Sequence, residues 1–341
     1  MFVYFCDHGG PGLLAFPDQT LSARVLNDAL QEMYTSKRFS QLLFYVEACE
    51  SGSMFDGQLS SNHSILAITA ANPYEPSNAC FFDEVRGTFL SDVFSHAWLQ
   101  DAKSMSAHRK ETVETQMEHV RKNTHTSHVS VFGDNQVANR PCSQFEANPN
   151  PQDSNATIAA NQLVFLQNNT STDSHTDNVD QSTGDEKHNH RWLKLFTLPT
   201  PHVSLFLAKW RVRVRTGTAA TRALSDYKRL VSGRKLIDFT MHKLSVRFAQ
   251  ILQRDSQQIE LELLPVRSFN CYEPLLQRLE QRCFKPAQHS YVLRKLRPLV
   301  NACEYWTADG TSETVLQQLF SAVQAQCAKS TSSLSRLGSI H

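Results

Sequence analysis

The chain has 341 residues, of which 40% are hydrophobic, and its 34 Lys and Arg against 33 Asp and Glu give a formal net charge of +1. This length and apolar content are sufficient for two domains with buried cores. The near-zero net charge argues against a general binder of nucleic acid or anionic membranes. No apolar run in the sequence approaches the length of a membrane span.

Two apolar stretches near the start of the chain each end at a reactive side chain with glycine close behind. Residues 2–12 contain His8, and residues 42–53 contain Cys49. Residues 20–38 between them repeat apolar side chains at helical spacing, so the three segments predict a βαβ unit. Because the carboxyl ends of parallel strands meet at one edge of a sheet, we expect His8 and Cys49 to face each other.

A histidine beside a cysteine is the pair that thiol catalysis requires. The imidazole stabilises the attacking thiolate and later protonates the leaving amine. The N–H groups at Gly9 and Cys49 are placed to bind a developing oxyanion. A hydrogen-bonded strand-end histidine and a buried apolar cysteine are the structural alternative.

Four blocks of the sequence resemble those of the legumains, the asparaginyl endopeptidases of the C13 cysteine protease family in the caspase-like clan. They are YFCDHGGPG, FYVEACESGSM, TAANPYEPSNACFFDE and THTSHVSVFGD, in this order. The resemblance implies His8 as general base and acid, Cys49 as nucleophile, and the N–H groups of Gly9 and Cys49 as the oxyanion hole. It also implies an α/β fold with a caspase-like, mostly parallel sheet, followed by a disulfide-linked all-α C-terminal domain.

The resemblance places a substrate pocket near the end of the third apolar strand, residues 65–71. The matching pocket residues are Glu47, Ser77 and Asp92. Their carboxylates and hydroxyl accept hydrogen bonds from a side-chain amide, which suits asparagine and, at acid pH, aspartate at the P1 position. Pro76 stands where the family usually has a second serine. Structural ion pairs are the alternative for the two carboxylates.

The sequence starts inside the predicted first strand and has no signal peptide there. The resemblance implies an upstream segment with two strands, the residue that orients the histidine, and part of the substrate pocket. We therefore expect the chain to lack its N-terminal segment and to have little activity as given.

The middle of the chain changes in character after residue 134. Residues 87–100 and 106–122 predict helices and residues 129–132 a last strand. Residues 135–201 are rich in Asn, Gln, Ser, Thr, Asp and His and predict a solvated linker. Sequons for glycosylation stand at Asn62, Asn155, Asn168 and Asn169. His188 and His190 are only a weak metal signal, and we expect neither a metal nor another cofactor.

The C-terminal part predicts helices over residues 221–254, 272–284, 290–304 and 311–328. Cys271 and Cys283 lie on about one helix and roughly 18 Å apart, too far to bridge each other. Antiparallel packing of the next helix favours a disulfide between Cys271 and Cys303, which leaves Cys283 for Cys327. The resemblance implies the same pairs. A zinc site is the competing interpretation, but its cysteines are normally closer in sequence.

Charge is unevenly distributed along the chain. Residues 1–134 carry 9 basic against 16 acidic side chains, whereas residues 202–254 carry 12 against 2. An acidic catalytic part and a basic helix attract each other at neutral pH, and protonation of carboxylates weakens the contact. We therefore expect the C-terminal part to cover Cys49 as a pH-released lid. A solvated basic helix is the alternative.

The sequence thus predicts a partial protease domain (1–134), a linker (135–201), a basic linker and long helix (202–254), a helical prodomain (255–328) and a tail (329–341). Three functions remain open: an endopeptidase that cleaves after Asn and less readily Asp, made as a zymogen; an incomplete, inactive homologue that acts through folding or binding; and a transamidase that attaches glycolipid anchors. The resemblance implies peptide substrates, inhibition by the chain's own prodomain and by cystatin-type proteins, a monomer, and a lysosomal, vacuolar or secreted location.

Overall fold

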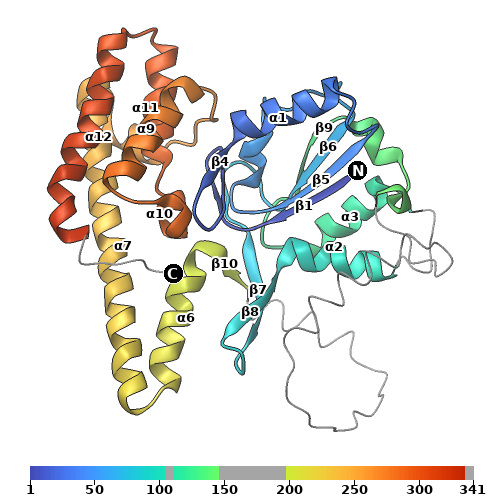
Figure 1. The fold of residues 1–341 in the computed structure, drawn as a ribbon, viewed down its shortest axis with the longest axis horizontal. Helices are drawn as coiled ribbons and strands as arrows, with labels where there is room; N and C mark the ends of the chain where they lie inside the picture. Colours follow the sequence, from blue (N-terminus) through green and yellow to red (C-terminus); the bar gives the residue numbers. More distant parts are fainter. Residues whose placement is uncertain (105–110, 146–196, 335–341) are drawn as a thin grey trace.

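The structure, a computed structural model, describes residues 1–104, 111–145 and 197–334. An α/β part and a helical part lie side by side (Figure 1). The α/β part is formed by the described residues up to 145 and a short strand, β10 (Leu198–Pro199), and the helical part begins at residue 200. No described helix is long and apolar enough to cross a membrane.

The main sheet has the strand order β1-β5-β6-β9. Its strands are β1 (Phe2–Cys6), β5 (Leu42–Glu47), β6 (Ile65–Thr69) and β9 (Ser130–Gly133). The first three strands are parallel, and β9 runs antiparallel to β6. Every residue of β5 and β6 is buried, as expected for apolar strands covered on both faces. The mostly parallel α/β sheet predicted from the sequence is confirmed.

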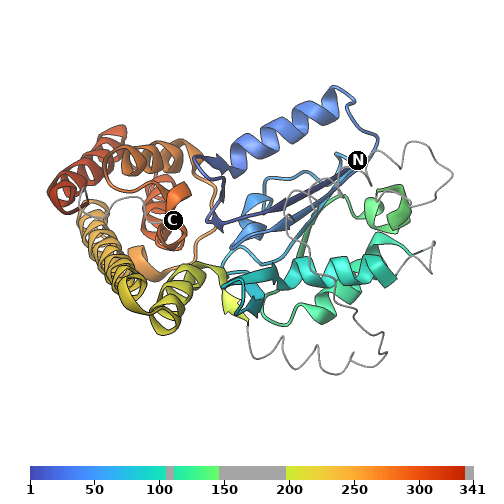
Figure 2. The ribbon, with the colours of Figure 1, turned by 60° about the horizontal axis from the view of Figure 1, so that its bottom comes forward.

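Helices cover both faces of this sheet (Figures 1 and 2). Helix α1 (Ala23–Thr35) lies on one face, and α2 (Val93–Ser104) and α3 (Val113–Asn123) lie on the other. Because side chains alternate along a strand, Phe44 packs into the core on the α1 side and Tyr45 into the core on the α2 side. The first βαβ unit expected from the sequence is present.

The prediction of one helix over residues 87–100 is wrong in its first part. Strand β8 (Thr88–Asp92) pairs with β7 (Asn78–Asp83) in an antiparallel hairpin, and α2 begins only after it. Gly87, at φ +65°, forms the turn, which favours glycine. The short strand carries no clear alternation, so tertiary pairing overrides the helical interpretation of the sequence.

The prediction of a solvated linker starting at residue 135 is also wrong at its start. Two short 3₁₀ helices, η3 (Asn135–Asn139) and η4 (Cys142–Gln144), pack under the sheet. Val137 and Cys142 are buried in the same core as α2 and α3. Polar residues outnumber the apolar ones in this stretch, so its composition did not indicate a packed element. Residues 146–196 of the predicted linker and the last seven residues of the tail lie outside the described residues.

The C-terminal part is helical throughout. Its helices are α6 (Thr200–Val214), α7 (Gly217–Leu252), α8 (Ser256–Leu261), α9 (Phe269–Arg282), α10 (Ser290–Leu293), α11 (Arg297–Ala308) and α12 (Glu313–Leu334). Residues 202–214, predicted as linker, are helical. Residues 290–304, predicted as one helix, divide into α10 and α11, because Pro298 lacks the N–H that a continuous helix needs and instead stands in the first turn of α11.

Two disulfides connect these helices. Cys271 on α9 is bonded to Cys303 on α11, and Cys283 at the end of α9 is bonded to Cys327 on α12. These are the two pairs favoured by the cysteine spacing. Bonded sulfurs are not available as zinc ligands, so the zinc interpretation does not fit this structure.

Loss of either disulfide is expected to destabilise the protein. The bonded cysteines are 32 and 44 residues apart, and loops of this length correspond to about 4 kcal/mol of unfolding free energy in the chain-entropy description. The double variant Cys283→Ser/Cys327→Ser, compared with the wild type by denaturant unfolding, measures this loss. Cys6→Ser, at an exposed free cysteine, is the control and is expected to change stability little.

The two parts share one continuous hydrophobic core. A three-stranded meander, formed by β2 (Gly9–Gly10), β3 (Leu13–Ala15) and β4 (Thr20–Ser22), carries the α/β side of this contact. Leu13 and Leu14 cluster with apolar residues of α9, α10 and α11. The hydroxyl of Tyr272 donates a hydrogen bond to the backbone oxygen of Pro11 at 2.9 Å. The helical part is therefore packed directly against the edge at which β1 and β5 end.

Candidate active site

His8 and Cys49 leave neighbouring strands at the same level. The last residues paired between β1 and β5 are Cys6 and Glu47, and His8 and Cys49 each follow two residues later. A Cβ atom added to Gly9 would lie 2.4 Å from the backbone oxygen of Cys49, so the two segments touch and only glycine fits there. The structure thus brings the segments that carry His8, Gly9 and Cys49 together at the carboxyl edge of the sheet.

Both reactive side chains are held in uncharged forms by burial. Cys49 is 2% exposed, and burial raises the pKa of its thiol to about 12. Burial also lowers the pKa of His8, which the nearby Asp7 only partly opposes. A thiol beside a neutral imidazole is a resting pair, because the attacking species is the thiolate. Exposure to water would move both pKa values towards the ion pair.

The expected pocket residues lie beside Cys49. The Ser77 hydroxyl is 3.7 Å from the sulfur of Cys49, and it is near enough to Glu47 to lower the pKa of that carboxyl, although these two make no hydrogen bond of ordinary geometry. Asp92, the last residue of β8, lies opposite Ala79 of β7. The structure therefore gathers Glu47, Ser77 and Asp92 around one place.

Both carboxyls near Ser77, those of Glu47 and Asp92, have raised pKa values. Burial, with repulsion from Asp92, raises the pKa of Glu47 to about 8. Burial raises the pKa of Asp92 to about 6. Among the described residues neither carboxylate forms an ion pair with Lys or Arg. The structural ion pairs considered from the sequence are thus not formed there.

A later segment of the chain occupies the edge of β7 next to this pocket. Strand β10 pairs antiparallel with Asn78 and Ala79. The N–H of Thr200 donates to the backbone oxygen of Ser77 at 3.0 Å, and the two hydroxyls are 3.3 Å apart. This contact was not predicted, because a two-residue strand has no periodicity and its partner lies more than 100 residues away.

A buried ion pair joins the helical part to the residue after Cys49. Arg297, in the first turn of α11, donates to the carboxylate of Glu50 and to the backbone oxygen of Pro73 at 2.7 Å. Both charged side chains are buried. Near the surface, Arg267 pairs with Asp56 at 2.9 Å and Arg24 pairs with Glu273 at 2.5 Å.

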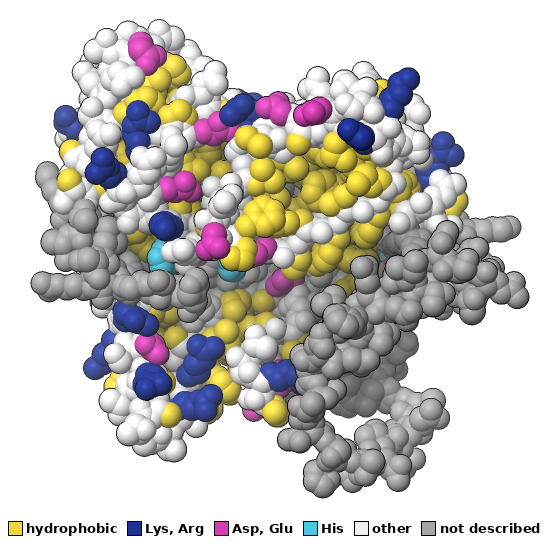
Figure 3. Space-filling view, in the orientation of Figure 1, with side chains coloured by type: hydrophobic (Ala, Val, Ile, Leu, Met, Phe, Trp, Pro, Cys, Tyr) yellow, Lys and Arg dark blue, Asp and Glu magenta, His cyan; other side chains and the backbone are white. Residues whose placement is uncertain are grey.

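The basic side chains of α7 are not the source of these contacts. Lys and Arg gather instead at the free end of the α6–α7 hairpin (Figure 3), where Lys209, Arg211, Arg213, Arg215, Arg222, Lys228 and Arg229 are exposed. The attraction of a basic helix to an acidic catalytic part, expected from the charge distribution, is therefore not how the parts are joined. The solvated alternative fits this end of α7, because net charge does not specify which side chains meet.

A cavity of about 290 Å³ lies between the α6–α7 hairpin and His8. Its lining includes Asp7, His8, Arg234 and Tyr291. Arg234 is buried and stacks 4.5 Å from the ring of Tyr291, and it also lies 3.5 Å from a ring nitrogen of His202. The candidate histidine therefore lines a cavity together with residues of the helical part.

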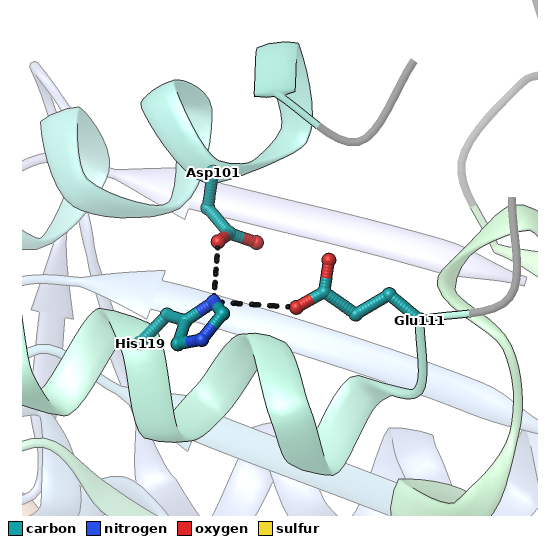
Figure 4. Close-up of side chains that lie close together, drawn as sticks. All are labelled: Asp101, Glu111 and His119. Atoms are coloured by element: carbon teal, nitrogen blue, oxygen red, sulfur yellow. Dashed lines mark hydrogen bonds and ion pairs between the residues drawn. The ribbon is translucent and has the colours of Figure 1, made fainter. Parts of the chain in front are cut away.

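Within the described residues, one group of His and carboxylate side chains is close enough to share a metal ion. Figure 4 shows Asp101 on α2, Glu111 just before α3 and His119 on α3, with Nδ1 of His119 2.9 Å from Asp101 and 3.3 Å from Glu111. A protonated imidazole between two carboxylates gives the same geometry. We assign this group to the packing of α2 against α3, away from Cys49.

Comparison with known proteins agrees with this geometry. A sequence model of the Peptidase C13 family matches residues 1–162, which include His8, Cys49 and the three expected pocket residues. Human legumain is 30% identical over 307 residues, which cover 89% of this chain and 63% of that protein. The chain belongs to the C13 peptidase family.

Two other relatives match over shorter lengths. Hemoglobinase of Schistosoma japonicum is 41% identical over 147 residues, 43% of this chain and 34% of that protein. The vacuolar-processing enzyme delta-isozyme of Arabidopsis thaliana is 37% identical over 171 residues, 46% of this chain and 36% of that protein. The chain spans less than two thirds of the length of these relatives. The caspase-like fold expected from the resemblance fits the sheet and the disulfide-linked helices.

Proposed function

We propose that the protein is a cysteine endopeptidase that cleaves after asparagine and less readily after aspartate. The observation that supports it best is the meeting of the His8 and Cys49 segments beside a buried pocket of hydrogen-bond acceptors. Cys49 attacks the scissile carbonyl carbon as a thiolate after His8 takes the thiol proton. His8 gives that proton to the leaving amine, and water then hydrolyses the thioester.

The N–H groups of Gly9 and Cys49 stabilise the oxyanion that forms during attack. The two segments are in contact, so both N–H groups can serve one oxygen atom. The P1 side chain enters beside Glu47, Ser77 and Asp92. An asparagine amide donates two hydrogen bonds and finds acceptors, whereas an apolar side chain would leave these buried groups unpaired.

The helical part acts in this proposal as the chain's own inhibitor. It packs on the meander that follows His8, its Thr200 bonds to Ser77, and the sulfur of Cys49 is buried beneath it. A substrate cannot reach Cys49 until these contacts open. This supports a zymogen whose C-terminal part is released or removed, and it is the same arrangement that makes the resting thiol unreactive.

The test of the function uses the full-length protein, which is incubated at acid pH. Three peptides that differ only at P1, with Asn, Asp or Gln, are compared. We expect cleavage after Asn, slower cleavage after Asp and none after Gln, whose amide is one methylene too long for the pocket. Equal cleavage after Asn and Gln, or no cleavage of any peptide, would contradict the proposal; the latter outcome would favour a non-catalytic homologue.

We further propose that the protein works in a lysosome-like or vacuole-like acidic compartment or outside the cell, as a monomer, with cystatin-type proteins as inhibitors. Support comes from its two disulfides, which persist in oxidising compartments. Asn62 is exposed and stands as a glycosylation site in this proposal. The other sequons, Asn155, Asn168 and Asn169, and the two linker histidines lie outside the described residues.

A further inference from the structure

The hydrogen bonds that hold the Glu47 carboxylate go to one of its two oxygens, Oε2. Ser95 is the third residue of α2, so its N–H is among those at a helix start that have no partner within the helix. This N–H donates to Oε2 of Glu47 at 2.8 Å, and the Ser95 hydroxyl donates to the same oxygen at 2.8 Å. The hydroxyl of Tyr4 lies 2.7 Å from the Ser95 oxygen.

These contacts define a direction for each proton. The Ser95 hydroxyl donates its only hydrogen to Glu47, so Tyr4 is the donor in the bond between the Tyr4 and Ser95 hydroxyls. Tyr4 in turn stands on β1, the strand that leads to His8. A chain of hydrogen bonds therefore runs from Tyr4 through Ser95 to Oε2 of Glu47.

The other oxygen of the carboxylate, Oε1, is buried without a hydrogen-bond partner among the described residues. Glu47 is 1% exposed, and within the described part of the chain no hydrogen-bond donor reaches its Oε1. A buried carboxylate oxygen without a partner is costly unless a ligand supplies one. Ser77 and Asp92, which belong to the same pocket, lie close to this carboxyl.

We propose that Ser95, supported by Tyr4, is a positioning residue that determines P1 specificity: it engages Oε2 of Glu47 so that Oε1 alone meets the P1 side chain. The inference rests on the proposed function and goes beyond it. When Glu47 is ionised, Oε1 accepts a hydrogen bond from the asparagine amide. When Glu47 is protonated, the proton is on Oε1, because Oε2 already accepts two donors, and Oε1 then donates to the oxygen of asparagine or aspartate.

Titration of Glu47 makes this exchange of roles depend on pH. The raised pKa of Glu47, about 8, means that the protonated form gains as pH falls through this value, and Asp92 follows at about 6. The two Ser95 bonds favour the ionised form and oppose burial. Without the Ser95 hydroxyl, the pKa of Glu47 rises further, and its proton is no longer confined to one oxygen.

Ser95→Ala in the full-length protein is expected to raise KM for the P1 Asn peptide about tenfold at near-neutral pH with little change in kcat, as for loss of one buried hydrogen bond. The pH at which cleavage after Asp begins is expected to move upward. Tyr4→Phe is expected to change both in the same direction by less. Ser95→Thr, which keeps the hydroxyl, is expected to behave as the wild type.

Ser127→Ala is the matched control, because it removes a buried hydroxyl that donates to the backbone oxygen of Ala70 at 2.6 Å instead of to Glu47. Glu47→Gln is the complementary variant. Ser95 would orient its amide oxygen inward and its NH2 towards P1, so cleavage after Asp relative to Asn should rise, and only the pH dependence due to Asp92 should remain.

Infrared titration of the Glu47 carboxyl provides a readout that does not need catalysis. Its midpoint is expected at higher pH in Ser95→Ala than in the wild type, with Ser127→Ala unchanged. An unchanged midpoint and unchanged KM in Ser95→Ala, or the same KM change in Ser127→Ala, would overturn the inference. A wild type that titrates as described but cleaves no peptide would overturn the proposed function alone.

Discussion

Cys49→Ala is expected to abolish cleavage of P1 Asn peptides by the full-length protein, and His8→Ala is expected to lower kcat/KM by about 10² to 10⁴-fold. Alanine at residue 49 removes the atom that forms the thioester, so no covalent route remains. Alanine at residue 8 removes the proton carrier, whose contribution is of this size in general acid–base catalysis. The measurement is the initial rate of peptide cleavage after acid incubation.

Cys142→Ala is the control for loss of a buried cysteine. Cys142 belongs to neither disulfide and is buried in the core on the α2 side of the sheet. It is expected to keep the cleavage rate, apart from any loss of folded protein, which thermal unfolding would reveal. A thiol reagent with Asn at P1 should label the wild type and Cys142→Ala but not Cys49→Ala. Cleavage that survives in Cys49→Ala would require another nucleophile and end the proposed mechanism.

The edge at which the two candidate residues meet was predictable because it depends on local patterns. The strands before His8 and Cys49 are apolar runs that stop at glycine, and the segment between them has helical periodicity. The handedness of a βαβ unit then places both strand ends together. This part of the fold needs no information about contacts distant in the sequence, and β1 does lie parallel to β5.

Contacts distant in the sequence were not predictable. Thr200 on Ser77 and Arg297 on Glu50 join residues more than 100 positions apart, and neither belongs to a repeating pattern. The partition of net charge suggested that α7 would join the two parts, but the side chains that meet come mainly from α9, with Arg267 before it and Arg297 on α11. Ser95 was missed for a related reason: its role depends on where α2 begins, and β8 had been interpreted as helix.

The structure also changes how the contact between the two parts should depend on pH. Burial raises the pKa of Glu50 to about 7, although Arg297 and Arg294 oppose this. In a separated state Glu50 is exposed and returns to its ordinary value near 4.5. Between these values the packed state binds more protons. This group therefore strengthens packing as pH falls through about 7, and its contribution is lost as pH rises through it.

The charged neighbours that lower the pKa of His202, at the start of α6, lie within the helical part. Its two ring nitrogens lie 3.5 Å from Arg234 and 3.4 Å from Arg294. Burial, with repulsion from the two arginines, lowers the pKa of His202 below 6.5. Because all three side chains belong to the helical part, this repulsion persists when the two parts separate. It therefore does not make the contact between the parts depend on pH.

Glu50→Gln is therefore expected to reduce the pH dependence of packing. An amide resembles the protonated carboxyl, which is the form that favours packing, so the variant should pack more tightly than the wild type at pH 8 and about equally at pH 4. One pKa unit of difference is worth about 1.4 kcal/mol, so the packing equilibrium should change tenfold or more at pH 8. The radius of gyration from pH 8 to pH 4 measures separation. The half-buried His63 provides the control variant His63→Gln, and a Glu50→Gln variant with the pH dependence of the wild type would show that Glu50 does not govern the contact.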